Sequence, residues 1–385
     1  MDISGAHFYY DLSLQNGHFA KGVVAGHLKV EGDLSLRETG FMDDVDFSSS
    51  QIGGALYMGG AQILTDGKSA DFDNAKVGTI AEFSNMDLKG PLILTGADLQ
   101  IVLLGRDATL HLGNPGKPSE EASLVDLEDV VVHRDMTIQA IGLEKLHAPA
   151  LEVLGQAVFQ DVKITGEADL TNAHFRDLTL GGDVIWPGQE SSLRLQGITF
   201  SDVSPGSMGG GTAAEARWES LLDNWVDRSA YSPDAYQQLE QAFRRAGRSD
   251  LADKTFERMK QRERERGHLS WLGKVWNYIL CGVIGYGREP HRALYWGIPI
   301  VIIGCFIFRP KHMRVRRVED EGSVYNAFWY SLELFLPVVT LLAAEIWIPK
   351  QDDWLRRNWA RIHSLLGWIL VPFALAAITG LVSTK

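Results

Sequence analysis

Residues 32–63 read GDLSLRETGFMDDVDFSSSQIGGALYMGGAQI, and a spacing of eleven residues runs through this stretch. Each unit has two apolar residues separated by one position, and a third apolar residue five positions later. The unit occurs at Leu34, Leu36 and Phe41, at Val45, Phe47 and Ile52, and at Leu56, Met58 and Ile63. Polar residues alternate with the apolar ones, which is the period of short β-strands with one buried face.

The same unit continues beyond this stretch. It resumes after a short insertion at Ala70, Phe72 and Val77, at Ala81, Phe83 and Leu88, and at Leu92, Leu94 and Leu99, and looser copies reach Phe175. Strands this short, with turns between them, favour a coil that stacks on itself over a sandwich, whose strands usually have about five or six residues. Two units complete one coil, with apolar residues stacked along the axis. We therefore predict a right-handed β-solenoid over residues 1–203.

A glycine-rich stretch, SPGSMGGGT at residues 204–212, marks a domain boundary, after which the apolar period changes from 2 to about 3.6. Ser232 followed by Pro233 predicts the start of a helix that ends near Gly247. A second helix begins at Ser249 and runs into a charged segment. The sequence thus predicts a linker and a helical hairpin over residues 204–269.

The C-terminal part contains three apolar stretches. Residues 362–382 carry no formally charged side chain over about 31 Å of helix, at roughly 1.5 Å per residue, which matches a bilayer core. Residues 294–308 form a shorter apolar stretch, and residues 324–349 form an interrupted one. Aromatic and basic residues in 270–292 predict an interfacial helix. We therefore predict a transmembrane α-helical domain over 270–385, with either three crossings or two crossings and a re-entrant segment.

The interrupted stretch contains the candidate site. Ionisable residues at the centre of a membrane cost at least ~2.5–3.5 kcal/mol each, so Glu333 and Glu345 are expected to face protein or water. Pro337, where a helix would kink or stop, and Thr340 lie between them. Glu333, Pro337, Thr340 and Glu345 are therefore candidate pore or polar coupling residues. The alternative is that the two carboxylates lie at the interfacial ends of a half-helix.

Several motifs resemble those of bacterial pentapeptide-repeat-like membrane proteins, some of which are labelled membrane-associated oxidoreductases. They are GDLSL at 32–36, ADLTNAHF at 168–175, IGYG at 284–287, YSLELFLPVV at 330–339, and GWIL at 367–370 followed by AITGL at 377–381. The order of span, basic loop, aromatic helix at 327–339 and final span is similar to two-span ion channels. This resemblance implies an oligomeric, channel-like membrane domain. The place of a potassium filter, residues 340–345, has no glycine, so potassium selectivity is not implied.

Charge and composition exclude several functions. Residues 1–200 carry 13 Lys and Arg against 29 Asp and Glu, and the remainder carries 24 against 20, so no nucleic-acid partner is expected. The two cysteines, Cys281 and Cys305, provide neither a disulfide framework nor a thiolate zinc site. Dinucleotide-binding and redox-cysteine motifs are absent from the sequence. We expect no catalytic residues, cofactor or metal, and an oxidoreductase is only a remote alternative.

The N-terminus lacks the pattern of a secretory signal, so the solenoid is expected on the cytoplasmic side of the inner membrane. The basic loop at 309–317 should also be cytoplasmic, which conflicts with a single crossing before it. The leading hypothesis is a sensing or interaction solenoid, able to bind a protein partner and coupled through residues 213–292 to a homo-oligomeric channel-like domain in the lipid bilayer. The alternative is a non-conducting, membrane-anchored scaffold.

Overall fold

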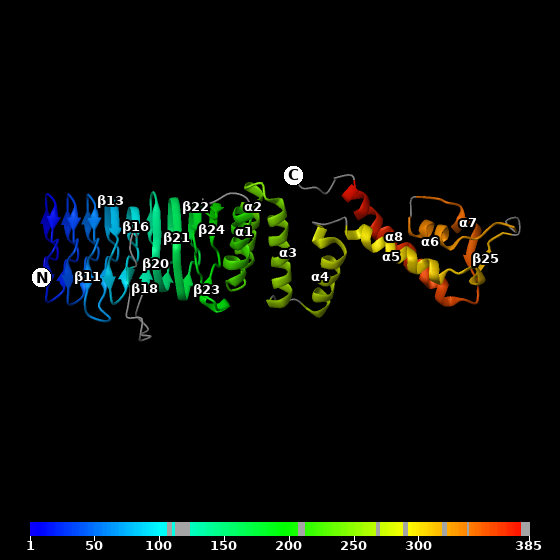
Figure 1. The fold of residues 1–385 in the computed structure, drawn as a ribbon, viewed down its shortest axis with the longest axis horizontal. Helices are drawn as coiled ribbons and strands as arrows, with labels where there is room; N and C mark the ends of the chain where they lie inside the picture. The colour runs from blue at the N-terminus through cyan, green and yellow to red at the C-terminus, as the bar shows by residue number, and fades with distance from the viewer. Residues whose placement is uncertain are drawn as a thin grey trace. The chain divides into compact units, whose positions relative to one another are not determined.

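Residues 7–204 form a β-solenoid of about eight turns, in which short parallel strands stack coil on coil (Figure 1). Lys29 pairs with His7 of the preceding coil and with Gln51 of the next, so one coil takes 22 residues, which is two of the eleven-residue units. The predicted solenoid and the length of its repeat are confirmed. The computed structural model describes residues 1–105, 110–111, 124–206, 212–266, 270–287, 292–317, 322–336 and 339–378.

The described strands form four stacks of parallel strands. The first holds β1 (His7–Phe8), β5 (Lys29–Val30), β9 (Gln51–Ile52), β13 (Lys76–Phe83), β16 (Asp98–Leu104), β19 (Val131–Val132), β21 (Glu152–Asp169), β22 (His174–Gly181) and β24 (Thr199–Ser204). The second starts with β2 (Leu12–Ser13), β6 (Leu34–Ser35) and β10 (Leu56–Tyr57) and continues through β13, β16, β20 (Met136–His147), β21, β22 and β24. The third holds β3 (His18–Phe19), β7 (Gly40–Phe41), β11 (Gln62–Ile63) and β14 (Asp87–Leu88), and β17 (Leu110–His111) pairs with β20. The fourth holds β4 (Val23–Val24), β8 (Val45–Asp46), β12 (Ala70–Asp71), β15 (Leu92–Ile93), β18 (Leu124–Asp126), β20, β21 and β23 (Leu193–Arg194).

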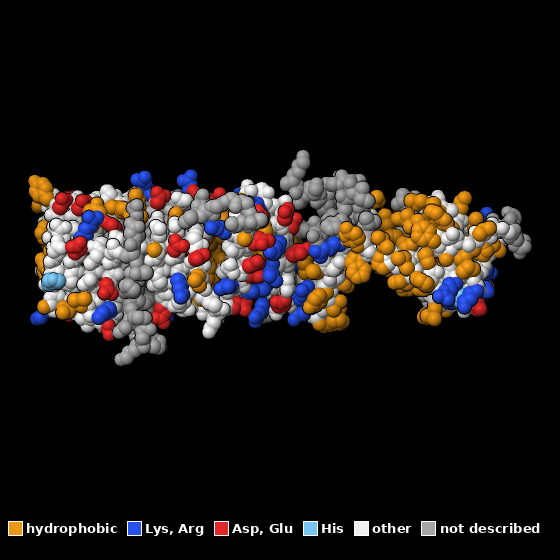
Figure 2. All heavy atoms as spheres, viewed as in Figure 1, with side chains coloured by type: hydrophobic (Ala, Val, Ile, Leu, Met, Phe, Trp, Pro, Cys, Tyr) orange, Lys and Arg blue, Asp and Glu red, His pale blue; other side chains and the backbone are white. Residues whose placement is uncertain are grey.

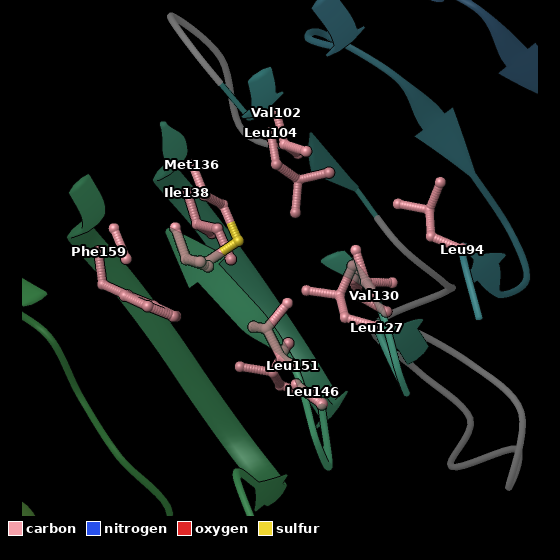
Figure 3. Packing of buried hydrophobic residues seen from close by; sticks show 14 of the residues in the cluster. Leu94, Val102, Leu104, Leu127, Val130, Met136, Ile138, Leu146, Leu151 and Phe159 are labelled. Carbon is pink, nitrogen blue, oxygen red and sulfur yellow. The ribbon is translucent and has the colours of Figure 1, made fainter. Parts of the chain in front are cut away.

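The apolar residues of the repeat fill the interior of the solenoid. Phe47 and Phe83 are fully buried, as the eleven-residue register predicts. Figure 3 shows the same arrangement further along, where side chains from successive coils, among them Leu127 and Phe159, point into the shared interior. Each such buried side chain stabilises the fold by roughly 1.5–3 kcal/mol relative to an exposed one, so the stack stabilises the coils collectively.

The corners of the coils use left-handed backbone, again at a spacing of eleven residues. The first such corners are at Gly5, Asn16, His27, Glu38, Ser49 and Gly60, with φ between 53° and 72°. The left-handed region costs an ordinary residue roughly 1–2 kcal/mol, whereas glycine adopts it freely and asparagine often does. Asn16 and Gly60 suit this conformation, but the backbone of the solenoid also imposes it on other residue types, such as Glu38.

Helices follow the last strand of the solenoid. They are α1 (Thr212–Ser220), the π-helical turn η2 (Leu221–Trp225), the 3-10 turn η3 (Val226–Arg228), α2 (Pro233–Arg245) and α3 (Ser249–Arg266). The predicted hairpin corresponds to α2 and α3, with Ser232 and Pro233 at the start of α2. The α2 helix packs against β24, and residues 1–259 form one compact unit that includes most of these helices.

Residues 260–385 form the second compact unit. Beyond the end of α3 it contains α4 (Trp271–Ile284), η4 (Gly285–Gly287), α5 (Arg292–Ile307), η5 (Pro310–His312), β25 (Met313–Val315), α6 (Ala327–Phe335), α7 (Ala343–Ile346), β26 (Trp347–Pro349) and α8 (Trp354–Ile378). Helices α5, α6 and α8 pack against one another, and β25 pairs antiparallel with β26. The helical character predicted for this part is confirmed.

Candidate functional site

The predicted polar residues occupy different environments in the second unit. Glu333 on α6 is buried, and its Oε2 accepts a hydrogen bond of 2.8 Å from the backbone N–H of Ala344. This carboxylate therefore caps the first turn of α7, where a negative charge is favourable. Glu345 and Thr340 are exposed, and Pro337 lies outside the described residues. Among the described residues, the predicted set does not form one enclosed cluster.

A second polar group lies between α5, α6 and α8. Ser331 and His363 are both fully buried. The Ser331 hydroxyl donates to the carbonyl of Val301 at 2.8 Å, and His363 Nε2 donates to the Ser331 carbonyl at 3.0 Å. His363 Nδ1 has no hydrogen-bond partner among the described residues. The sequence signal was a lone histidine in an apolar stretch, but nothing in the sequence paired it with Ser331.

Glycines allow this close packing. A Cβ at Gly304 on α5 would lie 2.1 Å from Ser331 Oγ, and a Cβ at Gly367 on α8 would lie 1.8 Å from the carbonyl oxygen of Phe335. Ser331 Oγ lies 2.8 Å from the carbonyl oxygen of Val301 and 3.3 Å from His363 Nε2. Because His363 Nε2 donates to the Ser331 carbonyl, it is not placed to accept the hydroxyl proton, so the serine is not arranged as an activated nucleophile. The group therefore joins three helices and does not resemble a catalytic pair.

The surface of the second unit is rich in exposed apolar side chains, which gather over α5, α6 and α8 in Figure 2. On α4, α5, α6 and α8 the large ones include Trp271, Trp276, Tyr278, Tyr295, Trp296, Phe306, Trp329, Trp354 and Trp368. Large exposed apolar patches are uncommon on the surfaces of monomeric proteins. In the described ranges, no helix combines the length and hydropathy that a membrane crossing needs.

The structure brings two basic stretches together. Arg314 on β25 lies opposite Ile348 on β26, and Lys350 N–H donates to the carbonyl of His312 at 3.0 Å. The segment 309–317 therefore adjoins the segment that begins at Lys350. Burial, together with nearby Arg356 and Lys311, lowers the pKa of His312. Burial is the largest cause of the lowered pKa, and the carboxylate of Asp353, 3.4 Å from His312 Nδ1, opposes it.

The fourth stack of the solenoid carries aspartates at equivalent positions in several coils. In each case Oδ1 accepts from the backbone N–H two residues later, at 2.9, 2.9, 3.1 and 2.9 Å for Asp46, Asp71, Asp126 and Asp169 respectively. We call these four residues the aspartate ladder. Each aspartate stabilises the corner that follows it. The ladder therefore has a structural role, and it also places negative charge along one face.

The charge environment differs along the aspartate ladder. Burial and the nearby carboxylates of Asp46 and Asp73 raise the pKa of Asp71. Burial also acts on Asp169, but hydrogen bonds from Thr171 and from Arg194 outweigh it and lower the pKa of Asp169. Arg194 Nη1 lies 2.8 Å from the Asp169 carboxylate. The pKa values of two aspartates at equivalent positions in the coils are thus shifted in opposite directions.

One group on this face has ligand atoms close enough for a metal ion. Ligand atoms of Asp126, Glu128 and His147 lie within 4.8 Å of one another. Residues 126 and 147 are brought together only because β18 pairs with β20. Asp126 already accepts the turn N–H of Glu128, and His147 Nε2 lies 3.4 Å from Glu128 Oε2. The turn hydrogen bond of Asp126 and the contact between His147 and Glu128 explain why these three side chains lie close together, and neither contact involves a metal.

The chain matches no protein-family model, no curated protein and no solved structure. The resemblance to pentapeptide-repeat-like membrane proteins therefore rests on the quoted motifs. Its solenoid part agrees with the fold over residues 7–204, whereas its membrane and channel parts stay predictions.

Proposed function

We propose that this protein is a membrane-attached interaction module, in which the second unit binds a lipid bilayer and the solenoid binds a partner protein. The observation that carries the proposal is the exposed aromatic and aliphatic surface of α4, α5, α6 and α8. Tryptophan and tyrosine are enriched where proteins meet the membrane interface, because the ring has an apolar body and a polar edge. Lipid would remove this surface from water.

The basic segments also support attachment to a membrane. Residues 309–317 and the segment from Lys350 to Arg361 adjoin one another, and anionic headgroups attract such clusters by about 1 kcal/mol per residue near the surface. The α5 helix has 16 residues, or roughly 24 Å at 1.5 Å per residue, and a bilayer core is about 30 Å thick. We therefore propose attachment in which these helices insert from the basic, cytoplasmic face of the inner membrane.

The solenoid supplies the interaction surface. Residues 1–200 have a net charge of −16, from 13 basic and 29 acidic residues, and the aspartate ladder lies along one face. A basic segment of another protein is the partner that this charge favours, because complementary charges guide association. The regular spacing of the coils would align repeated contacts along such a segment.

Flotation with lipid vesicles tests the proposal. The full chain is expected to float with vesicles of phosphatidylcholine and phosphatidylglycerol, and residues 1–259, which form a separate compact unit, are expected to stay in the dense fraction. Replacing Trp276, Trp296 and Trp368 with serine should weaken flotation of the full chain, because these exposed rings provide apolar contact.

The matched control replaces Tyr9 and Tyr10, which are 72% and 84% exposed on the solenoid, with serine. This variant also loses exposed aromatic rings but should float like the unchanged chain. Membrane attachment would be refuted if the full chain stayed in the dense fraction, or if both sets of substitutions had the same effect.

Ion conduction by an oligomer is a second candidate function. The specific observation in its favour is that ionisable Glu333 and His363 lie buried among apolar helices. Residues of this kind inside a membrane are functional candidates, because their desolvation is costly. Flux through vesicles that contain the full chain would separate this candidate from a non-conducting anchor.

A further inference from the structure

A cavity of about 810 Å³ lies within the first unit, between the last coils of the solenoid and the helices that follow them. Its solenoid wall comes from Asp161, Leu180 and residues 182–186. Its helical wall comes from α1, η2 and η3. Small-molecule sites generally have volumes of roughly 300–1,000 Å³, so the cavity has room for such a ligand.

The two walls carry opposite charges. Asp161 and Asp183 line the solenoid wall, and Arg217 and Arg228 line the helical wall. In the part of the chain that the structure describes, no ion pair joins the two walls. The Arg228 side chain makes only a long contact of 3.4 Å, to the Asn224 amide oxygen. Both cationic and anionic groups of the cavity are therefore available to a ligand.

The acidic wall has a defined geometry. The backbone N–H of Asp183 donates to Asp161 Oδ1 at 3.1 Å. Gly182, the residue before Asp183, has a φ of +65°. A Cβ added there would lie 2.0 Å from Asp161 Oδ1. A side chain at this position would displace the Asp161 carboxylate, which the backbone N–H of Asp183 holds in place.

Aromatic rings line the cavity next to these charges. The rings of Trp186 and Trp225 stack with centroids 6.2 Å apart and planes inclined by 25°. Trp225 is 1% exposed, and its indole N–H has no acceptor among the described residues. It belongs to the π-helical turn η2, and such turns frequently occur at functional sites. Trp186 is likewise only 3% exposed, so the apolar side chain that the cavity offers to a ligand is Ile185, which is 47% exposed.

We propose that this cavity binds a small zwitterion of the amino-acid class. Its carboxylate would bind Arg217 and Arg228, and its ammonium group would bind Asp161 and Asp183. Its side chain would pack on Ile185. An anion would leave the two carboxylates without a counter-ion, and a cation would leave the two guanidinium groups without one. All these residues lie in 1–259, so the proposal is independent of membrane attachment.

Ligand binding to the full chain in detergent micelles tests this proposal. Each proteinogenic amino acid is screened at millimolar concentration by saturation-transfer NMR, and the tightest binder is compared with its N-acetyl and carboxamide derivatives. Each derivative lacks one charge and should bind about tenfold more weakly or worse, because charge-assisted hydrogen bonds are the strong ones. Absence of binding by every amino acid, or equal binding by the derivatives, would overturn the proposal.

Substitutions locate the site. Arg217→Gln and Asp183→Asn should each weaken binding about tenfold, because each removes one charged contact. Arg217→Gln should also reduce the preference for the free carboxylate over the carboxamide, because only Arg228 is left to bind the carboxylate, whereas a general loss of folding would weaken both ligands alike. Arg176→Gln is the matched control, because Arg176 is an exposed solenoid arginine outside the cavity. This variant should bind the amino acid as tightly as the unchanged chain does. Unchanged binding by both cavity variants would refute the assignment.

Discussion

The rings of Phe47 and Phe72 stack with centroids 5.4 Å apart and planes inclined by 6°, although 25 residues separate them instead of the usual 22. The three additional residues lie in the insertion between these coils, and β8 still pairs with β12 so that Asp46 lies opposite Asp71. The apolar stack thus continues through the insertion, because pairing of the strands sets the positions of the rings.

Phe47→Ala is expected to destabilise the first unit by about 3–5 kcal/mol, because it leaves a cavity in a fully buried stack. Chemical unfolding of the full chain, followed by the β-sheet circular dichroism signal, measures the change. Val24→Ala is the control, because Val24 lies on the neighbouring strand β4 but is 45% exposed, and its effect should stay below about 1 kcal/mol. Equal effects of the two substitutions would contradict the register.

Asp71 and Asp169 hold equivalent positions in the aspartate ladder, yet their substitution by asparagine should have opposite effects at pH 7. Asparagine keeps an oxygen that accepts the turn N–H in both cases. The pKa of Asp71 is raised, so its ionisation destabilises the fold as pH rises. Asp71→Asn should therefore stabilise the protein at neutral pH, and the gain should vanish below the ordinary carboxyl value of about 3.9.

Asp169→Asn should destabilise the protein at pH 7, by on the order of 1 kcal/mol, because it removes the charge that pairs with Arg194. The pKa of Asp169 is lowered, so its contribution is present above about 3.9 and is lost as pH falls through the lowered value. Unfolding free energies measured from pH 7 to pH 3 test both variants. Shifts of the same sign at pH 7 would show that the local charges do not act as described.

Gly367→Ala should disrupt the packing of α8 against α6, because the added Cβ would lie 1.8 Å from the carbonyl oxygen of Phe335, a backbone atom. We expect a loss of about 1–3 kcal/mol, which is typical of overpacked interiors. Gly282→Ala on α4 is the control, because nothing lies within 4 Å of its added Cβ, and it should be neutral or stabilising. Thermal unfolding in detergent, followed by near-ultraviolet circular dichroism, distinguishes them.

Glu333→Gln and Glu345→Gln test ion conduction. Glutamine at 333 retains an oxygen that accepts the Ala344 N–H, so α7 should keep its cap. If an oligomer conducts, at least one substitution should change cation flux through vesicles while the size of the oligomer is preserved, because carboxylate rings attract cations. Vesicles that stay tight with the unchanged chain would eliminate conduction and leave the non-conducting anchor.

The solenoid could be predicted from the sequence because its pattern of apolar residues is local and repeated. The alternation of Leu34 with Leu36, and its recurrence at Val45 and Phe47, identifies both the buried face and the length of the coil. Parallel pairing between coils then follows from the constant spacing. The helices of the second unit were also expected, since apolar stretches such as 294–308 and 362–382 are visible without any long-range information.

The positions of the polar groups depended on tertiary packing. The sequence shows Glu333 and Glu345 as similar carboxylates, but the fold buries Glu333 against the start of α7 and exposes Glu345. Ser331 and His363 are 32 residues apart and meet only because α6 and α8 pack closely at Gly367. No periodicity encodes such a contact, since it arises from the way separate helices fill space.

The sequence by itself therefore determined the repeated solenoid, its inward-facing residues, the helical hairpin that begins at Pro233 and the separation of an acidic front from a more basic back. Only the tertiary structure decided which distant residues share a site: Asp161 with Arg217 in one cavity, and Asp126 with His147 on one face. The physical reason is that strand period and coil length are properties of neighbouring residues, whereas a cavity or a buried polar contact is set by how whole elements pack.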